Sequence, residues 1–225
     1  MGGREPVITI DGPAGAGKGT VARRLAQRLG YRLLDTGAMY RALAWSVAAA
    51  GLPPEDTPAL RAHIGTFRIT LRGDRVLVDG RDVTDEIRTP NIAALTSRLT
   101  TLAVVRDKLT PMQRAEAATG GVVLEGRDTG TVVCPDAEVK FYLDASLETR
   151  ARRRQSEFAE RGVAMDLEAV RGEIAARDHQ DTTRALAPLA KAADAIEVDT
   201  TAMSVDQVVD HMYEIVERRR CCTRS

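Results

Sequence analysis

The sequence predicts an α/β fold in which a five-stranded parallel sheet is flanked by helices and a smaller subdomain is inserted. Five short apolar segments alternate with helical patterns, which is typical of a parallel sheet covered on both faces. A glycine-rich turn follows the first strand and opens the first helix. Residues 67–83 instead alternate apolar and polar side chains and contain two glycine turns, Gly73-Asp74 and Asp79-Gly80, which predicts a small antiparallel sheet outside the main one.

The elements of the main sheet follow from their apolar patterns. Short apolar runs predict buried strands, and apolar spacings of three and four residues predict helices, the first of them stopped by Gly30. The expected strands are Val7–Ile10, Arg32–Asp35, Val122–Glu125, Val139–Leu143 and Ala195–Val198. The expected helices are Lys18–Leu29, Gly37–Ala50, Ser146–Arg161 and Asp166–Asp178, with a C-terminal helix opened by the capping-box pattern Ser204–Gln207.

The middle of the chain is expected to hold the inserted subdomain. Helical patterns begin at Thr89-Pro90, with proline at the first helical position, and run to about Thr119. We assign residues 60–100 to the insert and residues 1–59 and 101–225 to the core. A charged helix and the glycine that ends it place a short lid at about 150–165.

Composition excludes several classes of protein. The 225 residues carry 32 basic and 32 acidic side chains, and only 4 % are aromatic. Neither a nucleic-acid-binding protein nor a membrane-surface protein is therefore expected. No run of about 18 apolar residues predicts a membrane span, and the polar start at Met1–Glu5 does not resemble a secretory signal. We expect a cytoplasmic protein.

The numbers and spacing of cysteine and histidine bear on the compartment and on metal binding. Three cysteines do not make a disulfide framework, which favours a reducing compartment. The three histidines are scattered and form no zinc-like spacing with cysteine, so no protein-bound metal is expected. Cys221 and Cys222 lie in a C-terminal tail to which the sequence assigns no role.

The strongest motif is a phosphate-binding loop. It consists of Gly12, Pro13, Ala14, Gly15, Ala16, Gly17, Lys18, Gly19 and Thr20, between a predicted strand and a predicted helix. Glycines let backbone N–H groups converge on one point, and the helix N-terminus adds partial positive charge. Lys18 can then reach the β- and γ-phosphates of a nucleotide.

The loop departs from the commonest pattern at one position. Gly19 stands where a serine or threonine usually follows the lysine and binds Mg²⁺, and Thr20 comes one residue later. This form resembles nucleoside monophosphate kinases. The ion is then expected to travel with ATP, held mainly by phosphate oxygens and water. A GTPase is not favoured, because no Asn-Lys-x-Asp segment occurs.

Three further motifs make the resemblance specific. The segments Asp35–Arg41 (DTGAMYR) and Glu125–Thr131 (EGRDTGT) each follow a predicted strand, and Arg177–Arg184 carries Arg-Asp-x-x-Asp-x-x-Arg. Together with the loop they resemble bacterial cytidylate kinases over residues 5 to about 217. The resemblance implies a monomeric P-loop kinase that phosphorylates CMP and dCMP with ATP in pyrimidine metabolism, and it accounts for the inserted segment as a monophosphate-binding subdomain.

The resemblance also implies roles for single residues. The acceptor monophosphate would be bound by Arg41, Arg127 and Arg184, with Thr36 nearby, and the ribose by Arg177 and Asp181. Asp128 would accept from the cytosine amino group, while Ser97 and Arg106 meet N3 and O2. A carboxylate suits an amino donor and leaves uracil, whose O4 only accepts, without a partner. Thr96, Thr100 and Thr101 are close alternatives to Ser97.

The charged helix supplies the last candidates. Arg150 and Arg154 are four residues apart and so share a helix face, from which a closing lid could bring them to the transferring phosphate. A solvated surface is the competing interpretation of this helix. Two other functions stay open on the residues alone: a P-loop kinase for UMP, AMP or a metabolite such as shikimate, and a nucleotide-sensing module without turnover.

Overall fold

The computed structural model describes residues 4–160 and 162–223 and divides into two compact units. The first unit comprises Met1–Leu34 and Ala117–Ser225, and the second Asp35–Glu116. The second unit is wider than the predicted insert 60–100. The side chains of Cys221 and Cys222 and the whole of Arg161, where a helix was expected to end, lie outside the described part.

The first unit contains the main sheet. Its elements are β1 (Val7–Asp11), α1 (Lys18–Leu29), β2 (Arg32–Asp35, ending at the unit boundary), β6 (Val122–Glu125), a π-helical turn η2 (Thr129–Val133), β7 (Val139–Asp144), α6 (Leu147–Glu160), α7 (Leu167–Thr183), β8 (Ile196–Asp199) and α8 (Val205–Thr223). The strand order is β2-β6-β1-β7-β8, and β1 pairs in parallel with both β6 and β7. The predicted five-stranded parallel sheet is confirmed.

The position of β1 determines where the site forms. Because β1 lies between β6 and β7, the loop that leaves β1 and the turn that leaves β6 start side by side at the carboxyl edge of the sheet. The Gly126 N–H donates to the Ile10 carbonyl at 3.0 Å across this edge. Ligands of open parallel sheets bind at such edges.

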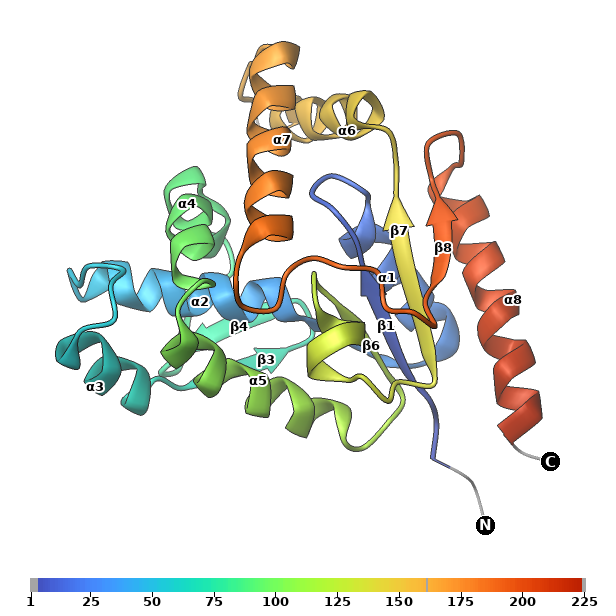
Figure 1. The fold of residues 1–225 in the computed structure, drawn as a ribbon, viewed down its shortest axis with the longest axis horizontal. Coiled ribbons are helices and arrows are strands. Elements are labelled where there is room, and N and C mark those ends of the chain that lie inside the picture. The colour runs from blue at the N-terminus through green and yellow to red at the C-terminus, as the bar shows by residue number, and fades with distance from the viewer. Residues whose placement is uncertain (1–3, 161, 224–225) are drawn as a thin grey trace. The chain divides into compact units, whose positions relative to one another are not determined.

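Both faces of the central strand are covered, as predicted. All five residues of β1 are buried. Ile8 and Ile10 pack with Leu25 of α1 and Met212 of α8, and Figure 1 shows these two helices on the same side of the sheet. On the other face, η2 approaches so closely that a Cβ on Gly130 would lie 2.8 Å from Thr9 Oγ1.

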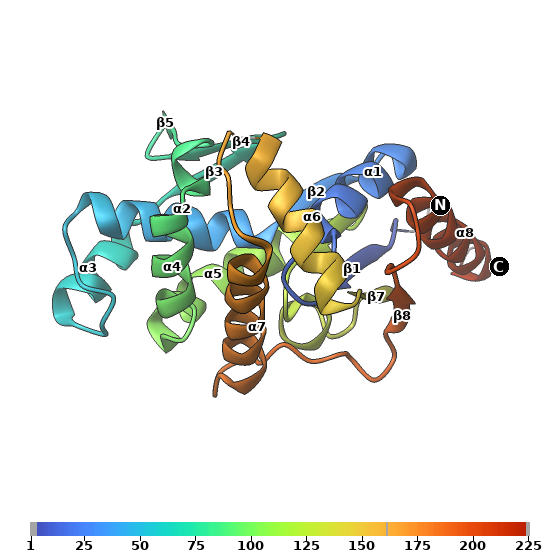
Figure 2. The same ribbon diagram turned by 90° about the horizontal axis from the view of Figure 1, so that it is seen from above.

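Helices α6 and α7 pack against each other (Figure 2) and lie beyond the end of β7 (Figure 1). Their contact is a small apolar cluster of Ala151, Val170 and Ile174, on which Ala14 of the glycine-rich loop also packs. The prediction that the α7 helix ends at Asp178 is wrong, because the helix continues to Thr183.

The second unit contains α2 (Thr36–Ala49), α3 (Pro58–Thr66), β3 (Ile69–Arg72), β4 (Arg75–Val78), β5 (Arg81–Asp82), the short 3-10 turn η1 (Glu86–Arg88), α4 (Pro90–Leu99) and α5 (Ala103–Ala117). The three strands form an antiparallel sheet in the order β3-β4-β5, which confirms the small sheet predicted at 67–83.

The sequence prediction differs from the second unit in two places. The helical pattern from Thr89 to about Thr119 is two helices, separated at Thr100–Leu102, where two threonine hydroxyls bond back to helix carbonyls. The helix α3 was not predicted. Within the described residues, no helix combines the length and apolarity that crossing a membrane requires.

Candidate active site

The phosphate-binding loop joins β1 to α1 and depends on three glycines with positive φ. Gly12, Gly15 and Gly17 have φ angles of 148°, 77° and 85°. A Cβ on Gly12 would lie 1.9 Å from the Leu143 carbonyl oxygen, so only glycine fits there. Among the described residues, no side chain caps α1 and no acidic residue stands in its first turn. The first amides of the helix are therefore left to bind a ligand.

Lys18 is the first residue of α1, and its side chain is folded over the loop. Its Nζ donates to the Pro13 carbonyl at 2.7 Å, and the residue is 5 % exposed. Burial, helped by the nearby Arg127 charge, lowers the Lys18 pKa to about 7, against the opposing effect of Glu125, Asp11 and Asp181. Desolvation of this kind makes an ammonium a strong partner for an incoming phosphate.

Acidic side chains stand beside the loop. A Cβ on Gly19 would lie 3.8 Å from both carboxylate oxygens of Glu125, at the end of β6. Oxygen donors of this kind suit Mg²⁺. Among the residues that the structure describes, however, no three acidic, histidine or cysteine side chains group closely enough to hold a metal.

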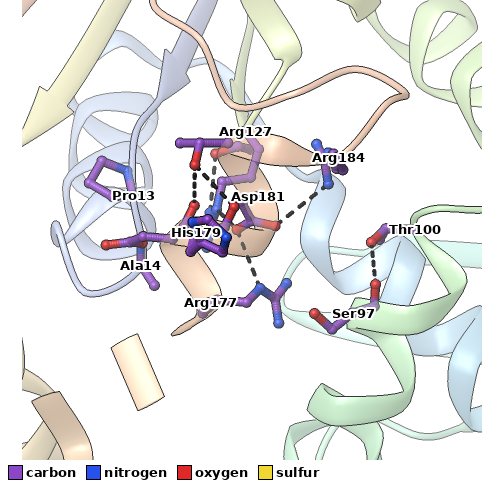
Figure 3. A network of polar contacts seen from close by, with 12 residues as sticks. Pro13, Ala14, Ser97, Thr100, Arg127, Arg177, His179, Asp181 and Arg184 are labelled. Atoms are coloured by element: carbon purple, nitrogen blue, oxygen red, sulfur yellow. Dashed lines mark hydrogen bonds and ion pairs between the residues drawn. The ribbon is translucent and has the colours of Figure 1, made fainter. Parts of the chain in front are cut away.

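Asp181 gathers three arginines from two segments of the first unit (Figure 3). Its Oδ2 accepts from Arg127 Nε at 2.9 Å and from Arg177 Nε at 3.3 Å. Its Oδ1 lies 3.6 Å from Arg184 Nη1, and Arg184 Nη2 lies 3.5 Å from Asp128 Oδ1. The structure thus brings together five residues that the sequence motifs singled out.

The negative charge of the Asp181 carboxylate is maintained by its neighbours. Asp181 is 1 % exposed, and burial alone would raise its pKa. The charges of Arg127, Arg177 and Arg184 outweigh burial and lower the Asp181 pKa below its ordinary value. Three guanidinium groups face the two carboxylates of Asp181 and Asp128, so positive charge remains for an anionic ligand.

The turn that carries Arg127 and Asp128 is anchored to β1. Asp11 is buried, and its carboxylate accepts from the N–H and hydroxyl of Thr129 at 2.9 and 2.8 Å and from the Gly130 N–H at 2.7 Å. Burial raises the Asp11 pKa despite these hydrogen bonds. Sequence reasoning did not assign Asp11 to the site, although it directly precedes the loop.

The second unit holds the remaining acceptor-site candidates. Asp35 caps α2 by accepting from the Ala38 N–H at 2.7 Å and pairs with Arg41 Nη2 at 2.9 Å, while Thr36 opens the helix and is buried. On α4 and α5, Ser97 and Arg106 are both buried, and the Arg106 guanidinium stands 5.8 Å from the Tyr40 ring centre.

Three threonines compete with Ser97 for the same role. Each of their hydroxyls donates to a backbone carbonyl: Thr96 to Ile92, Thr100 to Ser97 itself (Figure 3), and Thr101 to Arg98. These bonds occupy the hydroxyl hydrogen of every competitor.

The two predicted lid arginines have different surroundings, although they share a helix. Arg150 is buried, and its guanidinium donates to the backbone carbonyls of Ala14 and Ala145, both at 2.9 Å. Arg154 pairs with Glu157 at 2.7 Å and lies over the Phe158 ring. Of these two arginines, Arg154 is the one on the exposed side of α6 in this conformation.

One acidic residue near the loop was missed from the sequence. Asp178 accepts from the Ala14 N–H at 3.0 Å and pairs with Arg150. It is the second residue of the motif Arg177–Arg184, in which only the two arginines and Asp181 were given roles. Because Ala14 is 164 positions away, no local pattern indicates the contact.

Comparison with known proteins shows the family of the chain. The family model described as cytidylate kinase matches residues 8–218. A cytidylate kinase of Geobacter sulfurreducens is 46 % identical and covers 99 % of this chain and 97 % of its own; one of Geobacillus kaustophilus is 50 % identical, with coverages of 94 % and 96 %.

Among solved structures, an uncharacterized protein from Eubacterium ventriosum has the same fold. It aligns with a TM-score of 0.52 at 12 % identity and covers 95 % of this chain and 99 % of its own. That likeness concerns the fold alone. The family match and the two relatives span the phosphate-binding loop and the arginine motifs alike, and the chain therefore belongs to the cytidylate kinase family.

Proposed function

We propose that the protein transfers the γ-phosphoryl group of ATP to CMP and dCMP, giving ADP with CDP or dCDP. The observation that carries this is the Asp181 cluster beside Asp128. It offers guanidinium groups for a second phosphate and a carboxylate for a cytosine amino group, in the same unit as the phosphate-binding loop. A site for ATP and a site for a cytosine monophosphate are what the reaction requires.

ATP would occupy the loop. The amides of residues 12–20 would surround its phosphates, and Lys18 would exchange the Pro13 carbonyl for the β- and γ-phosphate oxygens. The Mg²⁺ that accompanies ATP would supply positive charge against the negative charge that develops during transfer. Thr20 and Glu125 are the oxygen-bearing side chains of the loop region that would face the ion or its water molecules.

CMP would be bound by the residues that the sequence motifs singled out. Arg41, Arg127 and Arg184 would bind its phosphate near Thr36, and Arg177 and Asp181 its ribose hydroxyls. Asp128 would accept from the N4 amino group, and Ser97 and Arg106 would donate to N3 and O2. With UMP, the Asp128 carboxylate would face the O4 atom, which is also an acceptor, and the two oxygens would repel each other, which favours cytosine.

Transfer would be direct and in line. An oxygen of the CMP phosphate forms the new bond to the γ-phosphorus while the bond to the bridging oxygen of ADP breaks. Catalysis then consists of positioning and of stabilising negative charge, with no covalent enzyme intermediate. Arg154 would leave its Glu157 partner and reach the transferring group when the lid closes, which also excludes water. Arg150 already bonds the loop backbone.

The proposal includes a monomer in the cytoplasm that binds neither nucleic acid nor membrane. The balanced charge of 32 basic and 32 acidic residues and the low aromatic content support the absence of nucleic-acid and membrane binding. The monomer rests on the family resemblance, and the cytoplasm on the cysteine usage. The sequence motifs had left other kinases and a non-catalytic sensor open. Asp128, Arg106 and Ser97 have no evident task with shikimate, and intact Lys18, Arg41 and Arg127 favour turnover.

The test is ADP release from Mg-ATP with CMP, dCMP, UMP, AMP and shikimate offered in parallel. Fast turnover with CMP and dCMP and little with the other three is expected. ADP release at the level without acceptor in all five reactions, from folded protein that binds ATP, would support the sensing module instead. Preference for UMP, AMP or shikimate would overturn the base assignments.

A further inference from the structure

Ala14, at the tip of the phosphate-binding loop, is held from three directions by the α6–α7 pair. Its N–H donates to Asp178 Oδ1 at 3.0 Å, and its carbonyl accepts from Arg150 Nη1 at 2.9 Å. Its methyl group packs on the apolar cluster between the two helices, which includes Val170 and Ile174. Every group that Ala14 presents is thus bound by a segment more than 130 positions away.

The two polar partners also bind each other. Arg150 Nη1 pairs with Asp178 Oδ2, while Arg150 Nε donates to the Ala145 carbonyl at 2.9 Å. The side chains are 9 % and 19 % exposed, so water competes weakly for these bonds. The closed ring of Ala14, Asp178 and Arg150 leaves the loop tip little freedom to turn.

The next residue of the loop is equally close to α6. A Cβ on Gly15 would lie 3.0 Å from Arg150 Cβ and 3.1 Å from the Arg150 carbonyl oxygen. The loop backbone therefore rests directly on the first turn of the helix. Any movement of Arg150 would change the direction of the neighbouring loop amides, which are the groups that face a nucleotide phosphate.

We infer that Asp178 and Arg150 are positioning residues that hold the loop tip in its ATP-binding conformation, an inference that rests on the proposed function. Arg150 then acts on ATP through the Ala14 and Gly15 backbone and does not itself contact the transferring phosphate. The same contact ties the α6–α7 pair to the loop, so the base of the lid is fixed and only its exposed part, which includes Arg154, is left to move.

The inference is tested with Asp178→Ala, Asp178→Asn and Arg150→Met in the full chain. Binding of ATP and of CMP is measured separately by calorimetry, together with melting temperature. We expect ATP affinity to fall about tenfold in Asp178→Ala and Arg150→Met, and less in Asp178→Asn, whose amide oxygen still accepts from the Ala14 N–H. CMP affinity should change less than about threefold.

Matched controls are Arg152→Met on α6 and Glu168→Gln on α7, which break exposed ion pairs of the same helices away from the loop. Their ATP affinity should equal that of the wild type. The inference is overturned if the ATP and CMP affinities of Asp178→Ala and Arg150→Met fall together, which would indicate a displaced α7. It is also overturned if the ATP affinity of these two variants stays within twofold of the wild type. Should Asp178→Ala not fold, Asp178→Asn, which keeps the shape of the side chain, decides the question.

The outcome is separable from the proposed function. ADP release by the wild type with CMP tests the function. The ATP affinity of the variants tests whether Asp178 and Arg150 position the loop. A wild type that binds ATP but does not phosphorylate CMP would refute the function and leave the variant comparison valid.

Discussion

Arg127 donates its Nε hydrogen to Asp181 Oδ2 at 2.9 Å, although 54 positions separate the two residues. The contact joins the turn after β6 to helix α7. Arg177 donates to the same oxygen, so the carboxylate fixes the directions of two guanidinium groups before any ligand arrives. Side chains oriented in advance lose less conformational entropy on binding.

Replacing Asp181 by asparagine should weaken both the fold and the acceptor site. Asp181→Asn leaves Arg127, Arg177 and Arg184 without their shared negative charge, and we expect the free energy of unfolding to fall by about 3 kcal/mol. KM for CMP should rise at least about tenfold, with a smaller change in KM for ATP. Urea denaturation and steady-state kinetics at pH 7 measure both quantities.

The stability loss should depend on pH in a defined direction. The Asp181 pKa is lowered in the folded protein, so its contribution is present above the ordinary value of 3.8 and is lost as the pH falls through the lower, folded value. The difference in unfolding free energy between wild type and Asp181→Asn should therefore shrink below about pH 4. A difference that grew on acidification would contradict the assignment.

Lys18→Met should abolish most turnover without harming the fold. The variant cannot stabilise charge on the phosphates, and ADP formation should fall about 100- to 1,000-fold. Because Lys18 is buried, an apolar side chain of similar length removes a desolvation cost, and the melting temperature should stay equal or rise. Lys191→Met, which breaks an exposed pair with Glu197, is the control. Full activity in Lys18→Met would refute its role.

ATP binding should weaken as the pH rises through the Lys18 pKa of about 7. Below that value the side chain is mostly protonated and attracts the phosphates; above it, the ammonium must be formed on binding. Affinity should fall between about pH 7 and pH 9, and binding at pH 8 should take up protons. Calorimetry in two buffers of different ionisation enthalpy measures the uptake. Lys18→Met should show neither effect, and a wild type without proton uptake would contradict the pKa shift.

Much of this fold could be predicted from local pattern. The helix Lys18–Leu29 and the strands Arg32–Asp35 and Val122–Glu125 have the predicted bounds, because each is a short apolar run or an amphipathic repeat. Glycine directly follows the helix and the second of these strands. The capping box is also confirmed: the Ser204 N–H donates to Gln207 Oε1 and the Gln207 N–H to Ser204 Oγ, at 2.9 and 3.2 Å.

The differences have tertiary or overlooked local causes. Helix α7 passes the predicted end at Asp178 because Asp181, one turn further, is bound by arginines, one of them from another segment. Helix α3 had a local signal, since Thr57 caps it, Pro58 opens it, and Leu60 and Ile64 are buried four residues apart. Of the site, the loop and motifs were visible in sequence, whereas the Asp178 contact to Ala14 arises only on folding.

Gly12→Ala should remove ATP binding and destabilise the protein. The new Cβ would lie 1.9 Å from the Leu143 carbonyl oxygen at a φ of 148°, so the backbone of the loop or of β7 has to shift. We expect the unfolding free energy to fall by more than about 2 kcal/mol, with a loss of ATP affinity. Gly172→Ala is the matched control, because it has open space inside α7 and should stabilise by up to about 1 kcal/mol. Gly12→Ala with normal ATP affinity would show that the loop tolerates a side chain there.

The choice of base should move with Asp128. In Asp128→Asn the side chain can donate to the uracil O4 as well as accept from a cytosine amino group, so discrimination between the two bases should decrease. We expect kcat/KM for CMP to fall about 10- to 100-fold and that for UMP to fall less or to rise. The variant also weakens the contact of Asp128 with Arg184, which affects both substrates equally and cancels in the ratio of their kcat/KM values. Asp136→Asn, an exposed carboxylate eight residues further along the chain, should leave the ratio unchanged. A parallel loss for CMP and UMP in Asp128→Asn would mean that Asp128 acts through Arg184 alone and that the base is recognised elsewhere.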